Sequence, residues 1–429
     1  MRKMKQMKQL ALILILVMIL NCIFSINVLA AEPDLNAEAA ISVELSTGKV
    51  VYDKNAHKKM YPASTTKVMT ALLVLENCDL NEKATVSYNA IQAVPEGYSN
   101  ANLQVGEELT IKDLLYVLMI PSANEAANVL AEHIAGSVES FATMMNTRAE
   151  ELGCETTHFV NPNGIHNDDH YSSAYDLYLI AKEAMKNETF RKIVSTTKCT
   201  LPATDKYPEN DRTFVNTNKL IVYNNSNRAD NYYYKNAIGI KTGFTSQAGN
   251  CLISAASKDG VEYINVVLNC ELTDDGLSYR FLDSKELFEY DYNNFEFSVL
   301  KEENEKVETV EVKNATKDTK NLDVLVKENL IVFKKNDLDE GDINQEITYN
   351  QNLVAPIAKG EVIGTVKYDV DGLEYTAELI AGNDVEQSKV ALYCLIIGGT
   401  SLILGIALMP KKKKGRSKKQ KIKKNIYKY

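Results

Sequence analysis

The stretch Pro62-Ala-Ser64-Thr-Thr-Lys67-Val-Met-Thr-Ala-Leu72 places a serine and a lysine three residues apart, directly before an apolar run with helical spacing. Residues three apart share one face of a helix, so Ser64 and Lys67 are predicted to project side by side from its first turn. A serine hydroxyl is a poor nucleophile at neutral pH and needs an adjacent base. A lysine amine serves as that base when burial or nearby positive charge lowers its pKa. The stretch therefore predicts a nucleophile and its base at the start of a helix.

A second motif, Ser122-Ala-Asn124, follows the helix-end signal Met119-Ile-Pro121. Because the residue before a proline is biased away from helical geometry, both polar side chains are predicted to lie on a loop between helices. A hydroxyl at Ser122 is suited to relaying a proton, and a carboxamide at Asn124 is suited to hydrogen-bonding an amide. By themselves, however, such residues are more often ordinary loop and cap residues.

A third motif, Lys241-Thr-Gly243, ends a predicted strand. An ammonium group and a hydroxyl on such an edge can hold a carboxylate, and Gly243 would allow a ligand to approach the backbone closely. An extended peptide lying along this edge would pair with it as an added strand. The motif therefore predicts a binding edge for a peptide carboxylate.

The order of the three motifs is stronger evidence than any one of them. The S-x-x-K pattern also begins at three other serines: Ser46, Ser195 and Ser298. The first lies in a Ser-Thr-Gly turn between two predicted strands. The second has no S-x-N motif between it and Lys241, and the third lies beyond Lys241. Only Ser64 opens a predicted helix and has both partner motifs downstream.

Residues 32–292 are predicted to form one α+β domain. Strands are expected near both of its ends, with helices between them. The expected strands are Ala39–Glu44, Lys49–Tyr52, Ala237–Thr242, Asn250–Ser257 and Glu262–Asn269. The expected helices are Val68–Leu75, Leu109–Met119, Ala126–Ile134, Leu177–Ala184 and Tyr279–Tyr290.

Residues 297–382 have a different pattern, with short alternating stretches separated by charged turns. Such alternation predicts a small β-rich domain. The expected strands are Val307–Val312, Leu322–Val326, Leu330–Phe333 and Glu361–Tyr368.

The two ends of the chain indicate passage through a membrane. Residues 1–31 join a basic start to an apolar run and a small-residue cleavage site, which is typical of a signal peptide. Residues 389–409 are almost entirely apolar, and about 20 such residues match a bilayer core. Residues 410–429 carry eleven Lys or Arg and no acid. This tail is predicted to be cytoplasmic, so the preceding domains would lie outside the membrane.

The net charge of −9 conceals a strongly acidic middle region. Without the four basic residues of the predicted signal and the eleven of the tail, 33 basic residues face 57 acidic ones, a net charge of −24. Such a charge disfavours nucleic-acid binding. The seven cysteines show no C-x-x-C spacing, so the sequence indicates neither a metal site nor a disulfide framework, and no cofactor is expected.

With these motifs, the chain resembles the low-molecular-weight penicillin-binding proteins that act as D-alanyl-D-alanine carboxypeptidases, which are serine peptidases. The resemblance covers residues from about 36 to 380 and is densest in Thr47–Asp53, Pro62–Leu72, Pro121–Ala127, Asn161–Gly164, His170–Asp176 and Gly239–Thr245. It implies a penicillin-binding/β-lactamase-like transpeptidase domain, and Ala355–Glu361 resembles part of the family's β-rich stalk domain. Expected partners are peptidoglycan stem peptides ending in D-Ala-D-Ala, β-lactam antibiotics as covalent inhibitors, and the cell membrane.

The resemblance also implies roles for single residues. Ser64 would be the acylated nucleophile and Lys67 its base, while Ser122 and Asn124 would flank the cleft. Lys241 and Thr242 would hold the terminal carboxylate, beside Gly243. The backbone N–H groups of Ser64 and Phe244 would form the oxyanion hole, and Arg280 would help bind the carboxylate. Two departures are Glu125, where the family often has Asp, and the predicted membrane-crossing helix, where the family usually has a helix lying on the membrane.

Other interpretations remain open from the sequence. A β-lactamase of class A would need a glutamate in an E-x-x-L-N loop, and the nearest pattern is Glu183-Ala-Met-Lys-Asn187. A wall-binding or sensor protein without catalysis is a further alternative. His170 either lines the site or is an ordinary loop residue, and no histidine–acid pair is placed for a Ser-His-Asp arrangement.

Overall fold

The computed structural model describes residues 32–209, 211–223, 231–273, 276–390 and 393. These residues form two compact units. One extends to Glu296 and includes Lys335–Asp337, and the other contains Phe297–Lys334 and residues from Leu338 onward. The predicted signal at 1–31, the tail at 410–429 and nearly all of the predicted membrane helix at 389–409 lie outside the described residues. Among the residues that are described, none of the helices has the length and apolar character needed to cross a bilayer.

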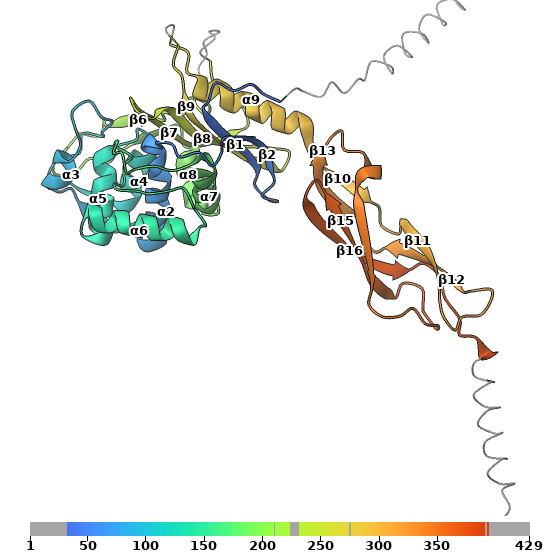
Figure 1. The fold of residues 1–429 in the computed structure, drawn as a ribbon. Helices are drawn as coiled ribbons and strands as arrows, with labels where there is room; N and C mark the ends of the chain where they lie inside the picture. The colour runs from blue at the N-terminus through green and yellow to red at the C-terminus, as the bar shows by residue number, and fades with distance from the viewer. Residues whose placement is uncertain (1–31, 210, 224–230, 274–275, 391–392, 394–429) are drawn as a thin grey trace, which may run out of the picture. The chain divides into compact units, whose positions relative to one another are not determined.

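The first unit is organised around an antiparallel sheet, which has five strands in the described part of the chain. Its order is β2-β1-β9-β8-β7, so β7 lies at one edge (Figure 1). The chain contributes two strands before the helices and three after them. The strands are β1 (Ala39–Glu44), β2 (Val50–Lys54), β7 (Ala237–Thr245), β8 (Gly249–Lys258) and β9 (Val261–Cys270).

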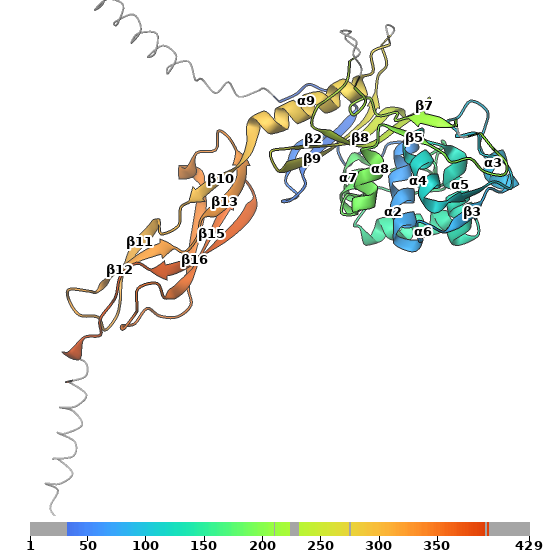
Figure 2. The same cartoon turned by 180° about the vertical axis from the view of Figure 1, so that it is seen from behind.

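Both faces of this sheet are covered by helices. Side chains alternate between the two faces along each strand, so each strand contributes to both packing layers. On β9, Ile264, Val266 and Leu268 join the main apolar core. Tyr263 and Asn265 point the other way and hydrogen-bond carbonyl oxygens of helix α9 (Tyr279–Asn294). Figures 1 and 2 show α9 on one face, with α7 (Ala174–Ala184) and α8 (Glu188–Val194) on the other.

The helices of the first unit pack around α2 (Lys67–Asn77), which contacts α4, α5, α6, α7 and α8. Its first eight residues are all buried, because neighbours surround it. The other helices are α3 (Tyr88–Gln92), α4 (Ile111–Met119), α5 (Asn124–Ala135) and α6 (Val138–Glu151). Side-chain oxygens cap several of them: Thr110 accepts from Asp113 N–H, and Ser173 accepts from Asp176 N–H. Short strand pairs join β3 (Lys83–Thr85) to β4 (Glu108–Thr110) and β5 (Lys198–Thr200) to β6 (Thr213–Val215).

The second unit is β-rich. Its larger antiparallel sheet has the order β11-β12-β16-β15-β14, and β10 pairs with β13. Leu322, Val324 and Val326 point inward from β12 at alternate positions and form part of a separate apolar core. The strands are β10 (Phe295–Lys301), β11 (Lys306–Glu311), β12 (Asn321–Val326), β13 (Leu330–Lys335), β14 (Asn344–Tyr349), β15 (Val362–Val370) and β16 (Leu373–Ala381).

Every helix and strand expected between residues 32 and 382 is present, with ends shifted by a few residues. One expectation is wrong in a way that affects the site. Asn124 does not lie on a loop but is the first residue of α5, because Pro121 ends the preceding segment and the new helix begins three residues later. Ser122 does lie between α4 and α5. Several elements were not predicted from the sequence: helices α3, α6 and α8, the short strands β3 to β6, and strands β10, β14 and β16.

Candidate active site

Ser64 lies in the 3₁₀ turn η1 (Ala63–Thr66), which leads directly into α2. This tight turn places Ser64 one turn before Lys67, and the Lys67 Nζ atom is 2.9 Å from Ser64 Oγ. Ser64 is partly exposed, while Lys67 is completely buried. The structure therefore brings the predicted pair into contact, with only the hydroxyl open to the cavity.

Burial of the Lys67 amine favours its uncharged form. Its Nζ atom is 2.7 Å from Asn124 Oδ1 and 2.6 Å from the carbonyl oxygen of Asn163. Burial, followed by the positive charge of Lys241, lowers the pKa of Lys67 well below its usual value, against an opposing effect from Glu125. A neutral amine has two N–H donors and one lone pair. The two donors match the two oxygen acceptors, so the lone pair is left to accept the Ser64 O–H.

Ser122 faces the same cavity as Ser64, with an unusual backbone and an unused hydroxyl. Its φ is +69°, a left-handed value that is costly for a residue with a side chain. Its Oγ atom is buried and has no hydrogen-bond partner among the described residues. A hydroxyl held this way is available to a ligand. This arrangement is compatible with proton transfer at the edge of the cavity.

Asn124 does not line the cavity, but its hydrogen bonds connect Lys67 to the segment that contains Ser99. Its Oδ1 atom accepts from Lys67, and its Nδ2 atom donates to the carbonyl oxygen of Ser99 at 2.9 Å. Its backbone N–H donates to the same oxygen at 3.0 Å. The carboxamide therefore ties Lys67 to the Ser99 segment, and the expected hydrogen bond from Asn124 to a substrate amide stays a prediction.

Edge strand β7 forms the facing wall. Lys241 is buried and its Nζ donates to the carbonyl oxygen of Thr242 at 2.9 Å. Burial, followed by the positive charge of Arg280, lowers the pKa of Lys241 to about 7. The hydroxyls of Thr242 and Thr217 lie 2.6 Å apart, and Arg280 Nη1 donates to the carbonyl oxygen of Gly243 at 2.9 Å. This wall of the cavity therefore concentrates positive charge and hydroxyl groups.

Gly243 is needed at this point for a reason that differs from the expected one. A Cβ atom there would lie 2.9 Å from the carbonyl oxygen of Pro62 and 3.1 Å from the backbone nitrogen of Ser64. The close approach is thus between β7 and the nucleophile turn rather than only between β7 and a ligand. Because Ser64 N–H is an expected oxyanion donor, a side chain at residue 243 would disturb that donor directly.

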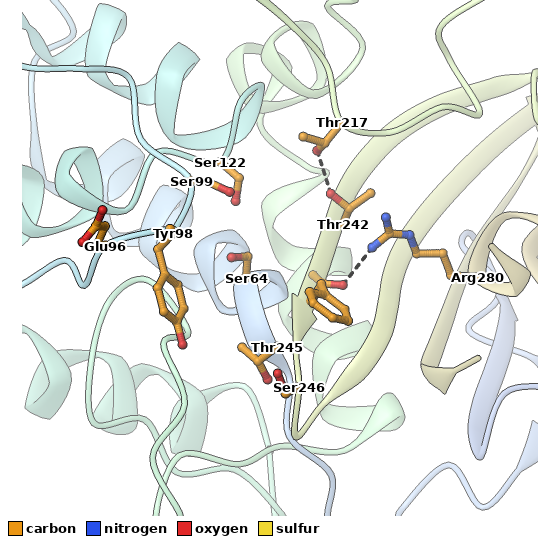
Figure 3. A pocket seen from close by; sticks show the side chains of 13 residues that line it. Ser64, Glu96, Tyr98, Ser99, Ser122, Thr217, Thr242, Thr245, Ser246 and Arg280 are labelled. Carbon is orange, nitrogen blue, oxygen red and sulfur yellow. Dashed lines mark hydrogen bonds between the residues drawn. The ribbon is translucent and has the colours of Figure 1, made fainter. Parts of the chain in front are cut away.

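The cavity between the two walls has a volume of about 410 Å³ (Figure 3). We call the Ser64, Ser99 and Ser122 wall the helix side, and the Thr217, Thr242 and Arg280 wall the strand side. Phe244, 59% exposed, also lines it. Seven lining residues were not predicted from the sequence. Most of them belong to loops whose spacing gives no periodic or motif signal, and Thr245 ends β7 beyond the Lys241-Thr-Gly243 motif. The seven are Glu96, Gly97, Tyr98, Ser99, Thr217, Thr245 and Ser246.

His170 is a structural residue behind the nucleophile turn. It is 2% exposed and does not line the cavity. Its Nδ1 accepts from Val160 N–H at 3.1 Å, so the Nε2–H is left to donate to Thr66 Oγ1 at 2.8 Å. Burial lowers the pKa of His170 to about 3, which keeps this ring neutral. Of the two interpretations left open by the sequence, the structure favours the non-catalytic one.

Glu183 lies away from the cavity. It pairs with Lys186 at 2.6 Å and lies 3.7 Å from Arg148. These are ordinary ion pairs on the helical surface. The glutamate that the class A β-lactamase interpretation requires is therefore not supplied by the Glu183–Asn187 segment.

Comparison with known proteins agrees with this geometry. A family model described as D-alanyl-D-alanine carboxypeptidase matches residues 26–271, and one described as the C-terminal domain of penicillin-binding protein 5 matches residues 295–387. The D-alanyl-D-alanine carboxypeptidase DacF of Bacillus subtilis is 35% identical over 78% of this chain and 82% of its own length. A D-alanyl-D-alanine carboxypeptidase of Streptomyces sp. K15 is 37% identical over 55% of this chain and 82% of its own length.

Solved structures give the same result. Penicillin-binding protein 5 from Haemophilus influenzae superposes with a TM-score of 0.60 at 26% identity, covering 83% of this chain and all of that structure. The Streptomyces K15 DD-transpeptidase superposes with a TM-score of 0.55 at 35% identity, covering 61% of this chain and 98% of that structure. The fold is thus an α+β penicillin-binding transpeptidase domain followed by a β-rich domain of the penicillin-binding protein 5 type. The chain therefore belongs to the low-molecular-weight penicillin-binding proteins that are serine-type D-alanyl-D-alanine carboxypeptidases.

Proposed function

We propose that the protein removes the terminal D-alanine from peptidoglycan stem peptides through an acyl-enzyme on Ser64. The observation that carries this proposal is the contact between Ser64 Oγ and the buried Lys67 Nζ, 2.9 Å apart. A neutral Lys67 accepts the hydroxyl proton as Ser64 attacks the carbonyl carbon of the D-Ala–D-Ala amide. A positioned base of this kind contributes about 10²- to 10⁴-fold to the rate.

The strand side supplies binding and charge stabilisation in this mechanism. Thr242 and Arg280 hold the terminal carboxylate, with the buried Lys241 behind them, and the stem peptide lies along edge strand β7. The oxygen of the tetrahedral intermediate accepts hydrogen bonds from the backbone N–H groups of Ser64 and Phe244. Such preorganised donors act where negative charge develops in the transition state.

The intermediate then collapses with cleavage of the amide C–N bond. The proton taken by Lys67 passes through the Ser122 hydroxyl to the amine of the leaving D-alanine. Water attacks the resulting ester at the same carbonyl carbon and gives one proton to the amine of Lys67. The bond between that carbon and Ser64 Oγ then breaks, and Lys67 passes the proton to Ser64 Oγ. The shortened peptide leaves as a carboxylate after its remaining acid proton goes to solvent. Penicillins acylate the same hydroxyl because their ring resembles the D-Ala–D-Ala dipeptide.

The direct test is D-alanine release from a Lys-D-Ala-D-Ala peptide by the purified full chain. We expect release that stops after penicillin treatment and is absent in Ser64→Ala. Ser195→Ala is the matched control, since it also removes the serine of an S-x-x-K sequence, and it should retain activity. Release that survives in Ser64→Ala would disprove the assignment. Acylation of Ser64 by penicillin without any release would favour the catalytically silent alternative.

Transfer of the acyl group to an amine is a second candidate reaction. It is favoured by the structure described as the Streptomyces K15 DD-transpeptidase, whose sequence is 35% identical to this chain. Hydrolysis and transfer share the Ser64 ester and differ only in whether water or an amine attacks it. Adding glycine or a D-amino acid to the reaction distinguishes them, because transfer yields a new amide product alongside free D-alanine.

The location of the protein is part of the same proposal. Residues 1–31 direct the chain across the cytoplasmic membrane, residues 389–409 anchor it, and the basic tail 410–429 stays in the cytoplasm. The support is the apolar run of about 20 residues followed by eleven basic residues. In cells, a chain ending at residue 388 should be released from the membrane fraction, while the full chain should resist alkaline extraction. Extraction of the full chain into the soluble fraction would contradict the anchor.

A further inference from the structure

Cys78, Glu82 and His133 form a cluster of metal-ligating groups outside the cavity. Cys78 is the C-cap residue of α2, Glu82 lies in the turn before β3, and His133 is in the last turn of α5. One ligating atom from each residue lies within 4.8 Å of the other two. His133 Nε2 and Glu82 Oε2 are already 3.2 Å apart. The three residues are separated in sequence, so no short motif announces them.

A thiolate, an imidazole and a carboxylate together form a donor set that suits zinc. Tetrahedral zinc holds these atoms at about 2.3, 2.0 and 2.1 Å respectively, so its ligand atoms lie about 3.3–3.7 Å from one another. The His133–Glu82 separation of 3.2 Å is already close to this range, and the separations to Cys78, at most 4.8 Å, need to shrink by about 1.5 Å or less. Side-chain rotation provides this change, because Glu82 and His133 are 52% and 28% exposed. The same exposure leaves a fourth position open to water.

The helices add a second, independent attraction for a cation. Both α2 and α5 end at this cluster, and the C-terminal end of a helix carries a partial negative charge. The last turn of α2 contains no basic residue, and that of α5 contains only His133. The site therefore combines an acidic side chain, a thiol and two negative helix ends, without a lysine or arginine in those last turns.

The same two helices meet at their opposite ends in the catalytic site. Lys67 is the first residue of α2 and Asn124 is the first residue of α5, and their side chains are hydrogen-bonded at 2.7 Å. The eleven residues of α2 span about 16 Å, so an ion at its far end does not touch the substrate. An ion there would instead fix the packing of the helix that carries the base against the helix that positions it.

We propose that Cys78, Glu82 and His133 bind one divalent zinc-like cation, with water as a fourth ligand, and that this ion holds α2 against α5. The thiol proton of Cys78 leaves to solvent as the sulfur coordinates the ion. No electron transfer is involved.

Cobalt(II) is the probe, because a cobalt–thiolate bond absorbs in the near ultraviolet and reports directly on Cys78. Titrating the purified full chain with CoCl₂ should give a 1:1 absorption that ZnCl₂ displaces. Cys78→Ser should abolish the band, and Glu82→Gln or His133→Gln should weaken binding at least tenfold. Cys199→Ser is the matched control, since Cys199 is also partly buried but lies on β5 outside the cluster, and it should keep the band.

The stability of the protein gives a second readout. Zinc should raise the melting temperature of the wild type and of Cys199→Ser by several degrees, and should not raise that of Glu82→Gln. The Glu82 side chain is exposed, so this variant should fold even if Cys78→Ser does not. A chain that shows no cobalt–thiolate absorption at equimolar cobalt would overturn the proposal. So would an equal zinc effect on the wild type and Glu82→Gln.

Discussion

Lys67, behind the helix side of the cavity, and Lys241, on its strand side, are both buried lysines with lowered pKa values, yet their surroundings differ. The Lys67 amine is matched to three oxygen atoms, those of Ser64, Asn124 and Asn163. The one hydrogen bond described for the Lys241 amine is to its neighbour's carbonyl oxygen. Each hydrogen-bonding position of the Lys67 amine therefore has a partner, whereas the Lys241 amine has spare donors beside Arg280. This difference fits the roles proposed for Lys67 in proton transfer and for Lys241 in binding an anion.

The largest expected effect is on the helix side. Lys67→Met removes the base that accepts the Ser64 proton, so acylation by penicillin should slow about 10³-fold or more. The measurement is the second-order rate constant of acylation, followed by mass spectrometry of the labelled chain. Lys241→Met is the matched control, because it removes the same group from the other wall. The two variants are also compared on an acylating ester without a carboxylate, so that carboxylate binding does not contribute to the rate. If both variants are slowed equally on that ester, the two lysines are not functionally different.

Arg280→Leu tests the strand side. Removing a charge-assisted hydrogen bond to the terminal carboxylate costs about 1.5–3 kcal/mol, so the KM for a D-Ala-D-Ala peptide should rise about 10- to 100-fold. The same peptide with a terminal carboxamide should show little difference between Arg280→Leu and the wild type. A similar loss on both peptides would mean that Arg280 acts through the carbonyl of Gly243 rather than on the ligand.

The two lysines should also differ in their effect on folding stability. Lys67→Met leaves the buried oxygens of Asn124 and Asn163 without their donor, which should cost about 1–3 kcal/mol in the free energy of unfolding. Lys241→Met leaves only the Thr242 carbonyl unpaired and removes a buried cation. It should therefore be less destabilising at neutral pH than Lys67→Met, as measured by urea denaturation.

The pH dependence of that difference follows from linkage. Between pH 7 and about 10.4, unfolded Lys241 holds a proton that the folded residue, with its pKa of about 7, does not hold. Stability contributed by this position therefore rises with pH across that window and is lost as pH falls toward 7. The free energy of unfolding of Lys241→Met, relative to that of the wild type, should be highest near pH 6 and lowest near pH 9. A pH-independent difference would contradict the lowered pKa of Lys241.

The smallest effect is expected at Glu183. Because this carboxylate pairs with Lys186 and Arg148 away from the cavity, Glu183→Gln should leave both acylation and deacylation unchanged within about twofold. Release of penicilloate from the labelled enzyme is the measurement. A marked slowing of deacylation would revive the β-lactamase interpretation.

The secondary structure around the motif residues could largely be predicted from the sequence. The Ser64–Lys67 pair followed from helical spacing alone, and strand β7 followed from its apolar alternation up to Lys241. Asn124 was assigned to a loop because a proline upstream signals a helix end but not where the next helix begins. The partners of its carboxamide, Lys67 and Ser99, could not be predicted because they are set by tertiary packing.

The parts that could not be predicted depend on segments brought together by the fold. Thr217 reaches Thr242 from a loop whose residues have no periodic pattern, and Gly164 packs on the nucleophile turn so closely that a Cβ there would lie 1.8 Å from the Ala63 carbonyl oxygen. The Cys78, Glu82 and His133 cluster is a similar case, because its ligating residues are spread over three elements. The five cysteines of the described residues are free.

The most direct test of the account is the pH profile of Ser64 acylation by penicillin, with Lys241→Met measured in parallel to separate the titration of Lys241. A neutral Lys67 predicts a rate constant that is level from neutral pH upward and falls only as acid protonates the amine at its lowered pKa. A rate constant that keeps rising to about pH 10.4, the usual pKa of lysine, would show that Lys67 is charged at neutral pH and would contradict the account.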